Sequence, residues 1–512
     1  MGKNLGRARF KEARSRCWRR FLRRFYDRVV DRTADDARRA GGRLTAFLIA
    51  ILLVASEALY LSLLRLNAVN GVWPVAIFLT IVSAAFALYL AAYLVLRNRA
   101  AGFAAQALAV GGAILFRVTL LPAGLPPDLP FSAKLAAMRA DWRGEDVTYE
   151  RFLLFDDDIW RYLWDGHVAA SGRNVYAFVP ADPALDDLAP PEGPGQPDWD
   201  SIRENVNYPH IPTVYPPAAQ MVFLAAHRLA PGSVLAMKVS VVSFDLLAYA
   251  FIILALAARG QPAARSILYG WNPLVIKVFA GSGHIDAVLV AALAGTCYLL
   301  ARKKPGAASV SLGLAIAAKI SPIVLLPFLA RRAGAWRAAL ALGTATVCYL
   351  PYLGGGTHLF DGLRVFSRGW QFNGGPFRFL VWLIGRFVSS PDAVARVTCA
   401  GLVAAALWLI YRRDDAHPNT FPKVALMALG AVLIFSPVVM PWYVTWLLPL
   451  GVLAEDRLAI FFSLAVCTAF LVMIRGVEWP WALMVEYGAL GALACWEILH
   501  RRSRAPAHAA VS

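Results

Sequence analysis

The chain is poor in charged residues. Only 16% of its 512 residues are Asp, Glu, Lys or Arg, whereas a soluble protein carries roughly 25%. Hydrophobic residues instead make up 59% of the chain. Apolar runs of about 18 residues or more, long enough to cross a bilayer core about 30 Å thick, recur between residues 44 and 499. This composition excludes a soluble enzyme and predicts an all-α polytopic membrane protein.

Motifs typical of several other protein classes are also missing. The six cysteines show neither CxxC nor zinc-ligand spacing, and none lies between residues 122 and 212, so no zinc site or disulfide framework is predicted there. The sequence has no GxGxxG motif, so a nucleotide-sugar donor has no recognisable binding site. It shows no secretory signal peptide and no convincing internal repeat of the kind that inverted-repeat transporters carry.

Positive charge is concentrated at the two ends. Residues 1–43 contain fifteen Lys and Arg against five acids, and residues 501–504 add three arginines. Positive segments stay on the cytoplasmic side of a membrane, so we expect both termini to be cytoplasmic and no nucleic acid as a partner. Apolar residues recur at helical spacing between Trp18 and Val30. They predict an amphipathic helix on anionic membrane lipids, with a disordered basic tail as the alternative.

The order of the apolar runs divides the chain into five parts. Three expected spans precede a polar, Pro-rich stretch, so that stretch is predicted to be external. In all, we expect about 13–14 transmembrane helices. The predicted parts are a basic cytoplasmic segment at 1–43, transmembrane helices at 44–121, an external loop carrying interfacial helices at 122–212, a transmembrane core at 213–499 and a cytoplasmic tail at 500–512.

Three consecutive acids, Asp156, Asp157 and Asp158, lie in the external loop within "FDDDIWRYLWDGHVAASGRNVYAF". Acids are favoured at a helix N-terminus by the helix dipole, so a simple capping role is one explanation. Three adjacent carboxylates also repel one another and can raise one pKa, which suits a general base or a metal site.

The segment that begins at Asp158 is predicted to form a helix. Asp158, Arg161, Tyr162 and Asp165 would share one face of it. The tryptophans at positions 160 and 164 would anchor this helix at the membrane interface.

Two apolar runs of the core are interrupted near ionisable side chains. Lys319 and Pro322 lie within "AIAAKISPIVLLPFLARR", and Asn272-Pro273 and "GSG" interrupt "GWNPLVIKVFAGSGHID". Broken helices at membrane depth are tolerated only beside protein or a cavity, and ionisable groups there tend to be functional. A structural histidine, or lysines that reach the membrane surface, would give the same pattern. The candidate residues of these runs are Lys277, His284, Asp286 and Lys319.

Six segments occur in an order known from one family. They are "DDDIWRYLWDGHVAASGRNVYAFVPADPAL", "TVYPPAAQMVF", "YGWNPLVIKVFAGSGHIDAV", "AIAAKISPIVLLP", "WQFNGG" and "PVVMPWYVTWLLPL". Together they resemble bacterial polyprenol-phosphate-mannose-dependent mannosyltransferases, which are polytopic GT-C-type glycosyltransferases similar to the α-1,6-mannosyltransferases of mycobacterial lipoglycan assembly. The resemblance covers residues 115–475 and implies the GT-C fold.

The resemblance implies an inverting sugar transfer on the external face of a bacterial inner membrane. The sugar, with mannose as the first candidate, would move from a polyprenyl monophosphate carrier to a glycan or glycolipid acceptor. An acid of the first large external loop would deprotonate the acceptor hydroxyl. Asp157 and Asp158 match the acidic pair of the family motif, and Asp156 is an additional acid. No metal is required, although three aspartates could recruit Mg²⁺ or Mn²⁺.

The resemblance also implies a substrate site, because basic and polar groups must stabilise the leaving phosphate. One departure from the family is Met440, which stands where a histidine often precedes "PWY". The expected substrate-binding residues are Arg161, Lys277, His284 and Lys319, which match family positions; Tyr215, Trp442 and Tyr443, which would shape the pocket; and Tyr162, Asp165 and Asp286.

Three other functions are consistent with parts of the pattern. A GT-C transferase could use another carrier-linked sugar, such as arabinofuranose or glucose. A lipid-linked-saccharide transporter or flippase would share the spans and the intramembrane Lys and His, but it would not need a large acidic and aromatic loop. A membrane scaffold without enzymatic activity is disfavoured by the density of ionisable residues near the ends of the spans.

Overall fold

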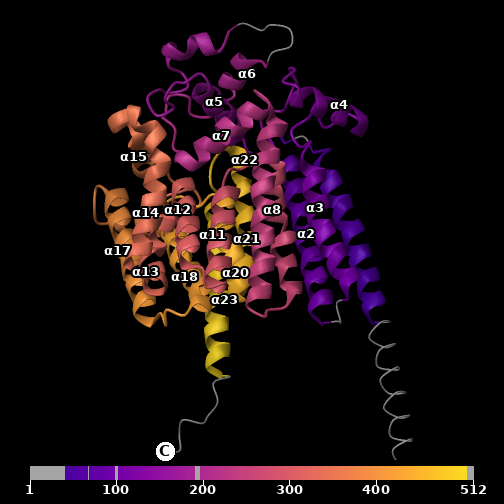
Figure 1. The fold of residues 1–512 in the computed structure, drawn as a ribbon, viewed down its shortest axis with the longest axis vertical. Coiled ribbons are helices and arrows are strands. Elements are labelled where there is room, and N and C mark those ends of the chain that lie inside the picture. Colours follow the sequence, from indigo (N-terminus) through magenta and orange to yellow (C-terminus); the bar gives the residue numbers. More distant parts are fainter. Residues whose placement is uncertain (1–40, 67, 99–101, 191–196, 504–512) are drawn as a thin grey trace, which may run out of the picture.

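The computed structural model describes residues 41–66, 68–98, 102–190 and 197–503. The predicted amphipathic helix between Trp18 and Val30 lies outside these residues. The described part is helical and contains no strand, only isolated bridges, which confirms the all-α prediction. Long helices form a bundle, and short helices cover one of its ends (Figure 1).

Eight helices of the described part are long and apolar enough to cross a membrane. They are Gly41–Leu63, Val72–Arg97, Phe103–Leu120, Val234–Ala258, Ala335–Gly369, Pro391–Arg413, Arg457–Arg475 and Pro480–His500. Five further apolar helices have 10–17 residues: Ala287–Ala301, Pro305–Ala318, Gly375–Ile384, Pro418–Ile434 and Pro441–Ala454. Together these make thirteen apolar helices in the described part, in line with the expected number of about 13–14. Five of them are short because Pro and Gly interrupt several of the apolar runs.

The N-terminal helices lie together at one side of the bundle (Figure 1). They are Gly41–Leu63, α2 (Val72–Asn98) and α3 (Phe103–Leu120). The following segment carries the covering helices, which are α4 (Phe131–Trp142), α5 (Asp158–Ala170), the 3₁₀-helix η1 (Pro183–Leu188) and α6 (Trp199–Glu204).

The central helices of the bundle come next in the sequence. α11 packs between α8 and α12, and α12 packs against α14. These elements are α7 (Pro217–Leu229), α8 (Val234–Ala258), η2 (Ala263–Ser266), α9 (Ile267–Gly270), α10 (Pro273–Ile276), the π-helical turn η3 (Lys277–Gly281), α11 (Ala287–Ala301), α12 (Pro305–Ala318), η4 (Ser321–Leu325), α13 (Leu326–Ala333) and α14 (Ala335–Tyr349).

The C-terminal part completes the bundle. It consists of η5 (Leu350–Phe360), α15 (Asp361–Gly369), α16 (Gly375–Ile384), α17 (Pro391–Arg413), η6 (Pro418–Thr420), α18 (Phe421–Ile434), α19 (Pro441–Val444), α20 (Leu447–Ala454), α21 (Arg457–Ala465), η7 (Val466–Leu471), α22 (Val472–Arg475) and α23 (Pro480–Ser503). The first described helix begins, and α23 ends, at the end of the bundle opposite α4, α5 and α6 (Figure 1).

Both predicted interruptions of the core helices are confirmed. α12 ends at Ala318 and α13 begins only at Leu326, because Pro322 has no amide hydrogen to continue an α-helix. The run from Ile267 is broken before Pro273 and changes to a π-helical turn at Lys277. Such π-turns often occur at functional sites.

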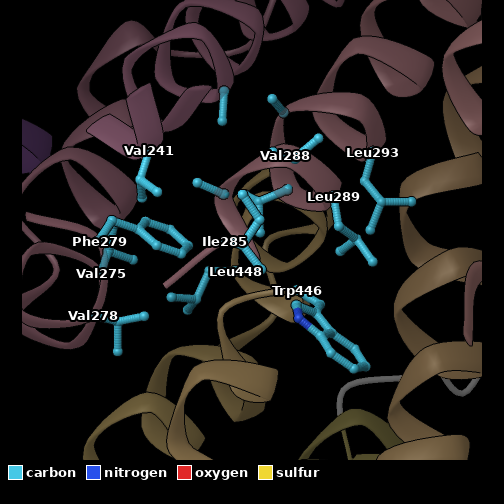
Figure 2. Close-up of a cluster of buried hydrophobic side chains, with 14 of the residues drawn as sticks. Val241, Val275, Val278, Phe279, Ile285, Val288, Leu289, Leu293, Trp446 and Leu448 are labelled. Carbon is cyan, nitrogen blue, oxygen red and sulfur yellow. The ribbon is translucent and has the colours of Figure 1, made fainter. Parts of the chain in front are cut away.

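Apolar side chains fill the space around the second interruption. Figure 2 shows Val275, Val278 and Phe279 from α10 and η3 facing Val288 and Leu289 of α11. The same cluster includes further buried side chains from α8, α11 and the α19–α20 region: Val241, Leu293, Trp446 and Leu448. This apolar packing holds the broken run rigid, so the ionisable groups that follow it have fixed positions.

Helix α5 is buried within protein. Trp160 and Trp164 were predicted to be anchors at the membrane interface, and this prediction is wrong, since they are only 5% and 1% exposed. Trp160 Nε1 donates to the Arg151 carbonyl at 2.8 Å, and α6 and α7 pack against α5. Gly166 permits the contact with α7, because a Cβ there would lie 2.6 Å from the Phe223 carbonyl oxygen.

Candidate active site

A cavity of about 470 Å³ lies where five segments distant in the sequence meet. The lining comes from the start of α5, the loop between α6 and α7, the break after α12, the α15 region and the segments from α18 to α22. The residues that line the cavity include Asp156, Asp157, Asp158, Arg161, Asn207, Tyr208, Tyr215, Lys319, Trp370, Gln371, Val432, Leu433, Trp442, Tyr443, Trp446, Phe470, Val472 and Met473.

Asp156 is a buried carboxylate that contacts a lysine and a histidine. Lys277 Nζ contacts its Oδ2, and His284 Nε2 lies 3.0 Å from the same oxygen. Burial alone would raise the pKa of Asp156, but Lys277 and His284 together lower it to about 2. Asp156 is therefore an anchor that ties the start of α5 to η3, and its stabilised negative charge makes it a poor proton acceptor.

Asp157 and Asp158 share one hydrogen-bond donor. Asn207 Nδ2 donates to Asp157 Oδ1 and to Asp158 Oδ1, both at 2.9 Å. Asp157 occupies the N-cap position of α5, but its side chain makes no capping hydrogen bond. The capping explanation of the acidic triplet is therefore wrong for this residue. Burial, and then the charge of Asp158, raise the pKa of Asp157 to about 6.

The second oxygen of Asp158 is also held. Tyr215 Oη donates to Asp158 Oδ2 at 3.1 Å, and Tyr162 Oη lies 3.5 Å from the same atom. His284 Nδ1 is 3.6 Å away, and the imidazole stacks on Trp442 with ring centroids 3.9 Å apart. His284 thus lies between Asp156 and Asp158 and fixes their separation.

Lys319 is the cation that the helix break brings into the cavity. Its Nζ donates to Asp286 Oδ1 at 2.9 Å and lies 4.5 Å from the Tyr443 ring centroid. Trp446 Nε1 donates to the same Asp286 oxygen at 2.7 Å. The side chain of Asp286 is buried, whereas that of Lys319 is 19% exposed, so the ammonium can reach a ligand in the cavity without leaving its partner.

Arg161 also faces the cavity, from the first turn of α5. Its Nε donates to Asp165 Oδ1 at 2.8 Å, and its Nη1 donates to the Ile211 carbonyl at 3.1 Å. Its buried Nη2 has no hydrogen-bond partner among the described residues. Thr213 and Gln220 both donate to Asp165, so the guanidinium is held by a fixed carboxylate.

The predicted site residues fall into two groups. Asp156, Asp157, Asp158, Arg161, Tyr215, Lys319, Trp442 and Tyr443 line the cavity. The other five residues contact side chains of this lining. Tyr162 and His284 approach Asp158, and Lys277 pairs with Asp156. Asp165 pairs with Arg161, and Asp286 pairs with Lys319. Lys277 and His284 therefore support the acids, whereas Lys319 and Arg161 face the cavity.

Sequence reasoning missed three residues of the site. Asn207 lies 49 residues after Asp158 in a loop without any motif, and Trp446 lies in the quoted "PVVMPWYVTWLLPL" segment but was given no role. Trp370 belongs to the "WQFNGG" segment, and its ring contacts Tyr208 at a centroid distance of 4.6 Å. Asn207 could have been found only from its neighbour Tyr208, which begins the aromatic run before α7.

Among the described residues, no group of three or more His, Cys, Asp or Glu side chains is arranged to hold a metal ion. The expectation that no metal is required stays a prediction, and activity in the presence of a chelator is the measurement that checks it. Met440 lines the cavity, so this part of the wall offers a thioether.

Comparisons with known proteins agree with these observations. The family model described as α-(1→6)-mannopyranosyltransferase, N-terminal domain, matches residues 152–335, and the model described as MptB C-terminal domain matches residues 384–500. Among curated proteins, the α-(1→6)-mannopyranosyltransferase A of Mycobacterium tuberculosis is 24% identical over 387 residues, covering 68% of this chain and 72% of the relative. No solved structure matches the chain with statistical significance.

Proposed function

We propose that this membrane mannosyltransferase works as a member of the α-(1→6)-mannopyranosyltransferase family, which two family models and the 24% identical relative support. Its donor is then a polyprenyl monophosphate mannose. The acceptor is a hydroxyl of a glycan or glycolipid on the external face of the membrane. The transfer inverts the anomeric carbon, and Asp157 is the base.

One observation carries the proposal. Acids, a cation and an apolar wall share a single cavity of about 470 Å³. The apolar wall includes Val432, Leu433, Val472 and Met473, which suit an isoprenoid chain that enters from the bilayer. A soluble nucleotide sugar has no isoprenoid chain that could cover this apolar wall, whereas a polyprenyl carrier would remove it from water.

Asp157 is a better base than either neighbour. The pKa of Asp157 is raised to about 6, close to the working pH that favours general-base catalysis. Its Oδ1 accepts from Asn207, and no side chain in the described part of the molecule donates to its Oδ2. The carboxylate of Asp158, by contrast, accepts hydrogen bonds on both oxygens.

The reaction uses the groups that line the cavity. Asp157 accepts the proton of the acceptor hydroxyl, whose oxygen forms a bond to the anomeric carbon while the bond from that carbon to the phosphate oxygen breaks. The polyprenyl monophosphate leaves with the bonding electrons. Lys319 and the unpaired Nη2 of Arg161 are placed to stabilise the negative charge on the phosphate.

The proposed orientation of the chain in the membrane rests on its charge distribution. Residues 1–43 are strongly basic, which favours a cytoplasmic location, and the first described helix begins at the end of the bundle opposite the acids (Figure 1). The acids then face the external side. In a variant without the native cysteines, Pro190→Cys should react with an impermeant thiol reagent in intact cells. Labelling only after permeabilisation would overturn the proposed orientation.

The donor is tested with purified full-length protein. It is incubated with an acceptor oligomannoside and, in separate reactions, polyprenyl phosphate mannose, polyprenyl phosphate glucose, polyprenyl phosphate arabinofuranose or GDP-mannose, and products are identified by mass spectrometry. We expect mannosylated product only from the first donor. Equal transfer from GDP-mannose by lipid-free protein would refute the carrier-linked donor.

The base is tested by two parallel substitutions. Asp157→Asn should lower kcat by at least about 10²–10⁴-fold, the usual contribution of a general base, while donor binding persists. Asp158→Asn should be less severe, because the amide can still accept one of the two hydrogen bonds. Near-native rates for both variants would show that the base lies elsewhere.

A further inference from the structure

Asn207 makes an unusual pair of contacts. One amide nitrogen, Nδ2, donates one hydrogen to Asp157 Oδ1 and the other to Asp158 Oδ1, at 2.9 Å in both cases. Both hydrogens of this amide are thus used on adjacent carboxylates. Asn207 lies in the loop between α6 and α7, and Tyr208 after it has a φ of +49°, a left-handed conformation that is uncommon for a bulky residue.

Tyr208 explains how this loop is held in place. Its ring contacts Trp370 edge to face, with centroids 4.6 Å apart, and both residues line the cavity. A strained backbone persists only where its surroundings hold it. Tyr208 is 57% exposed, so this contact with Trp370 and the two hydrogen bonds of Asn207 together hold the loop.

Two adjacent carboxylates without such a bridge would titrate as a coupled pair. Like charges at short range raise one pKa and lower the other, and a single proton is then shared between them. A donor that hydrogen-bonds to both ionised groups favours the doubly ionised state. In this arrangement Asp158 is further held by Tyr215, so only Asp157 keeps an oxygen for the substrate.

We propose that Asn207 is a positioning residue that keeps Asp157 and Asp158 ionised side by side and so assigns the proton-accepting role to Asp157 alone. The inference rests on the proposed function, because it takes Asp157 to be the base. Asn207 acts through the acids and does not itself touch the reacting atoms.

The other groups around the acids are independent of Asn207. Arg151 and Tyr208 are the remaining titratable neighbours of Asp157. The groups that face the rest of the triplet are Lys277 and His284 beside Asp156, and Tyr162, Tyr215 and His284 beside Asp158. None of these other side chains (Arg151, Tyr162, Tyr208, Tyr215, Lys277 and His284) has a described hydrogen bond to the Asn207 side chain, which donates only to Asp157 and Asp158. Replacing Asn207 therefore leaves their contacts with the acids in place.

The test is the pH dependence of kcat/KM with polyprenyl phosphate mannose as donor. Asn207→Leu keeps the side-chain volume but removes both donated hydrogen bonds. The acidic limb of the pH profile is the range in which the rate falls as Asp157 becomes protonated. For Asn207→Leu we expect this limb to shift to higher pH by about one to two units, which corresponds to the loss of one hydrogen bond to a charged group. Asn207→Asp places another carboxylate beside Asp157 and Asp158 and should shift the limb to still higher pH. At pH values well above the limb, Asn207→Leu should regain a rate within about threefold of the parent.

The matched control is Asn205→Leu. Asn205 lies two residues away and ends α6 through its backbone, and its side chain makes no described contact with the acids. Its pH profile should equal that of the parent. A structural role for Asn207 would instead lower the rate of the Leu variant equally at every pH, and this result, or an unchanged acidic limb, would overturn the proposal.

Failure of this inference can be told apart from failure of the proposed base. If Asp157 is not the base, Asp157→Asn stays active and keeps an acidic limb, whatever Asn207 does. If Asp157 is the base but Asn207 has no positioning role, Asp157→Asn is inactive while Asn207→Leu has the parent profile.

Discussion

Replacement of the buried cation Lys277 by methionine should destabilise the protein strongly. The side chains of Lys277 and Asp156 are only 2% and 5% exposed, so Lys277→Met leaves a buried carboxylate that has lost its lysine partner, with His284 Nε2 still 3.0 Å away. Breaking one partner of a buried ion pair costs about 3–5 kcal/mol. With about 2.1 cal/mol/K of unfolding entropy per residue, the 512 residues would convert this loss into about 3–5 °C of melting temperature.

The contribution of the Lys277–Asp156 ion pair to stability is measured by a double-mutant cycle in detergent. Lys277→Met, Asp156→Leu and the double variant are compared with the parent by thermal unfolding monitored through size-exclusion chromatography. Replacing both partners by apolar groups is often neutral, so the double variant should regain about 2 kcal/mol or more relative to Lys277→Met. If the double variant is no more stable than Lys277→Met, or if Lys277→Met has the melting temperature of the parent, the ion pair does not hold the acidic triplet.

Three further predictions follow from the same geometry. Since the pKa of Asp157 is raised to about 6, protonation below that pH removes the base, and kcat/KM should fall as pH drops through about 6; a flat profile would contradict this. Lys319→Met should raise the KM for the polyprenyl donor about 10–100-fold with little change in the acceptor KM, whereas the exposed Lys303→Met should change neither. Gly166→Ala should cost about 1–3 kcal/mol by overpacking α5 against α7, while Gly401→Ala, with open space around the added Cβ, should be tolerated; equal melting temperatures would argue against the close contact.

Those parts of the fold that depend on local signals could be predicted from the sequence. The helix that begins at Asp158 starts where expected, because side-chain periodicity along a helix is a property of neighbouring residues. The breaks at Pro273 and Pro322 were found for the same reason. Each follows from a proline that lacks an amide hydrogen.

Those parts that depend on distant contacts could not be predicted. Trp160 and Trp164 satisfy the pattern of an interfacial belt, but α6 and α7 fold over α5 and bury them. Whether a tryptophan faces lipid or protein is decided here by elements about 35 or more residues away in the sequence. The eight long helices likewise could not be counted from hydropathy, because a 14-residue apolar helix such as Pro305–Ala318 has the same composition as part of a longer span.

The same limit applies to the site. The sequence placed Lys277, His284 and Lys319 among the substrate contacts, since ionisable groups near helix breaks tend to be functional. Only the structure separates Lys277, which pairs with Asp156, from Lys319, which lines the cavity. The two lysines have similar sequence settings, and their different surroundings arise from the way η3 and the end of α12 pack.

The three consecutive acids can now be understood through the directions of their side chains. At the entry to a helix, neighbouring residues point in different directions, so three adjacent carboxylates cannot all meet one substrate atom. Asp156 is held by Lys277, Asp158 is held by Asn207 and Tyr215, and Asp157 between them keeps one oxygen for the substrate. Each neighbour also adds negative charge near Asp157, which with burial keeps its pKa at about 6. The flanking acids therefore make the central one a stronger base than an isolated aspartate, and this effect requires that both neighbours stay ionised.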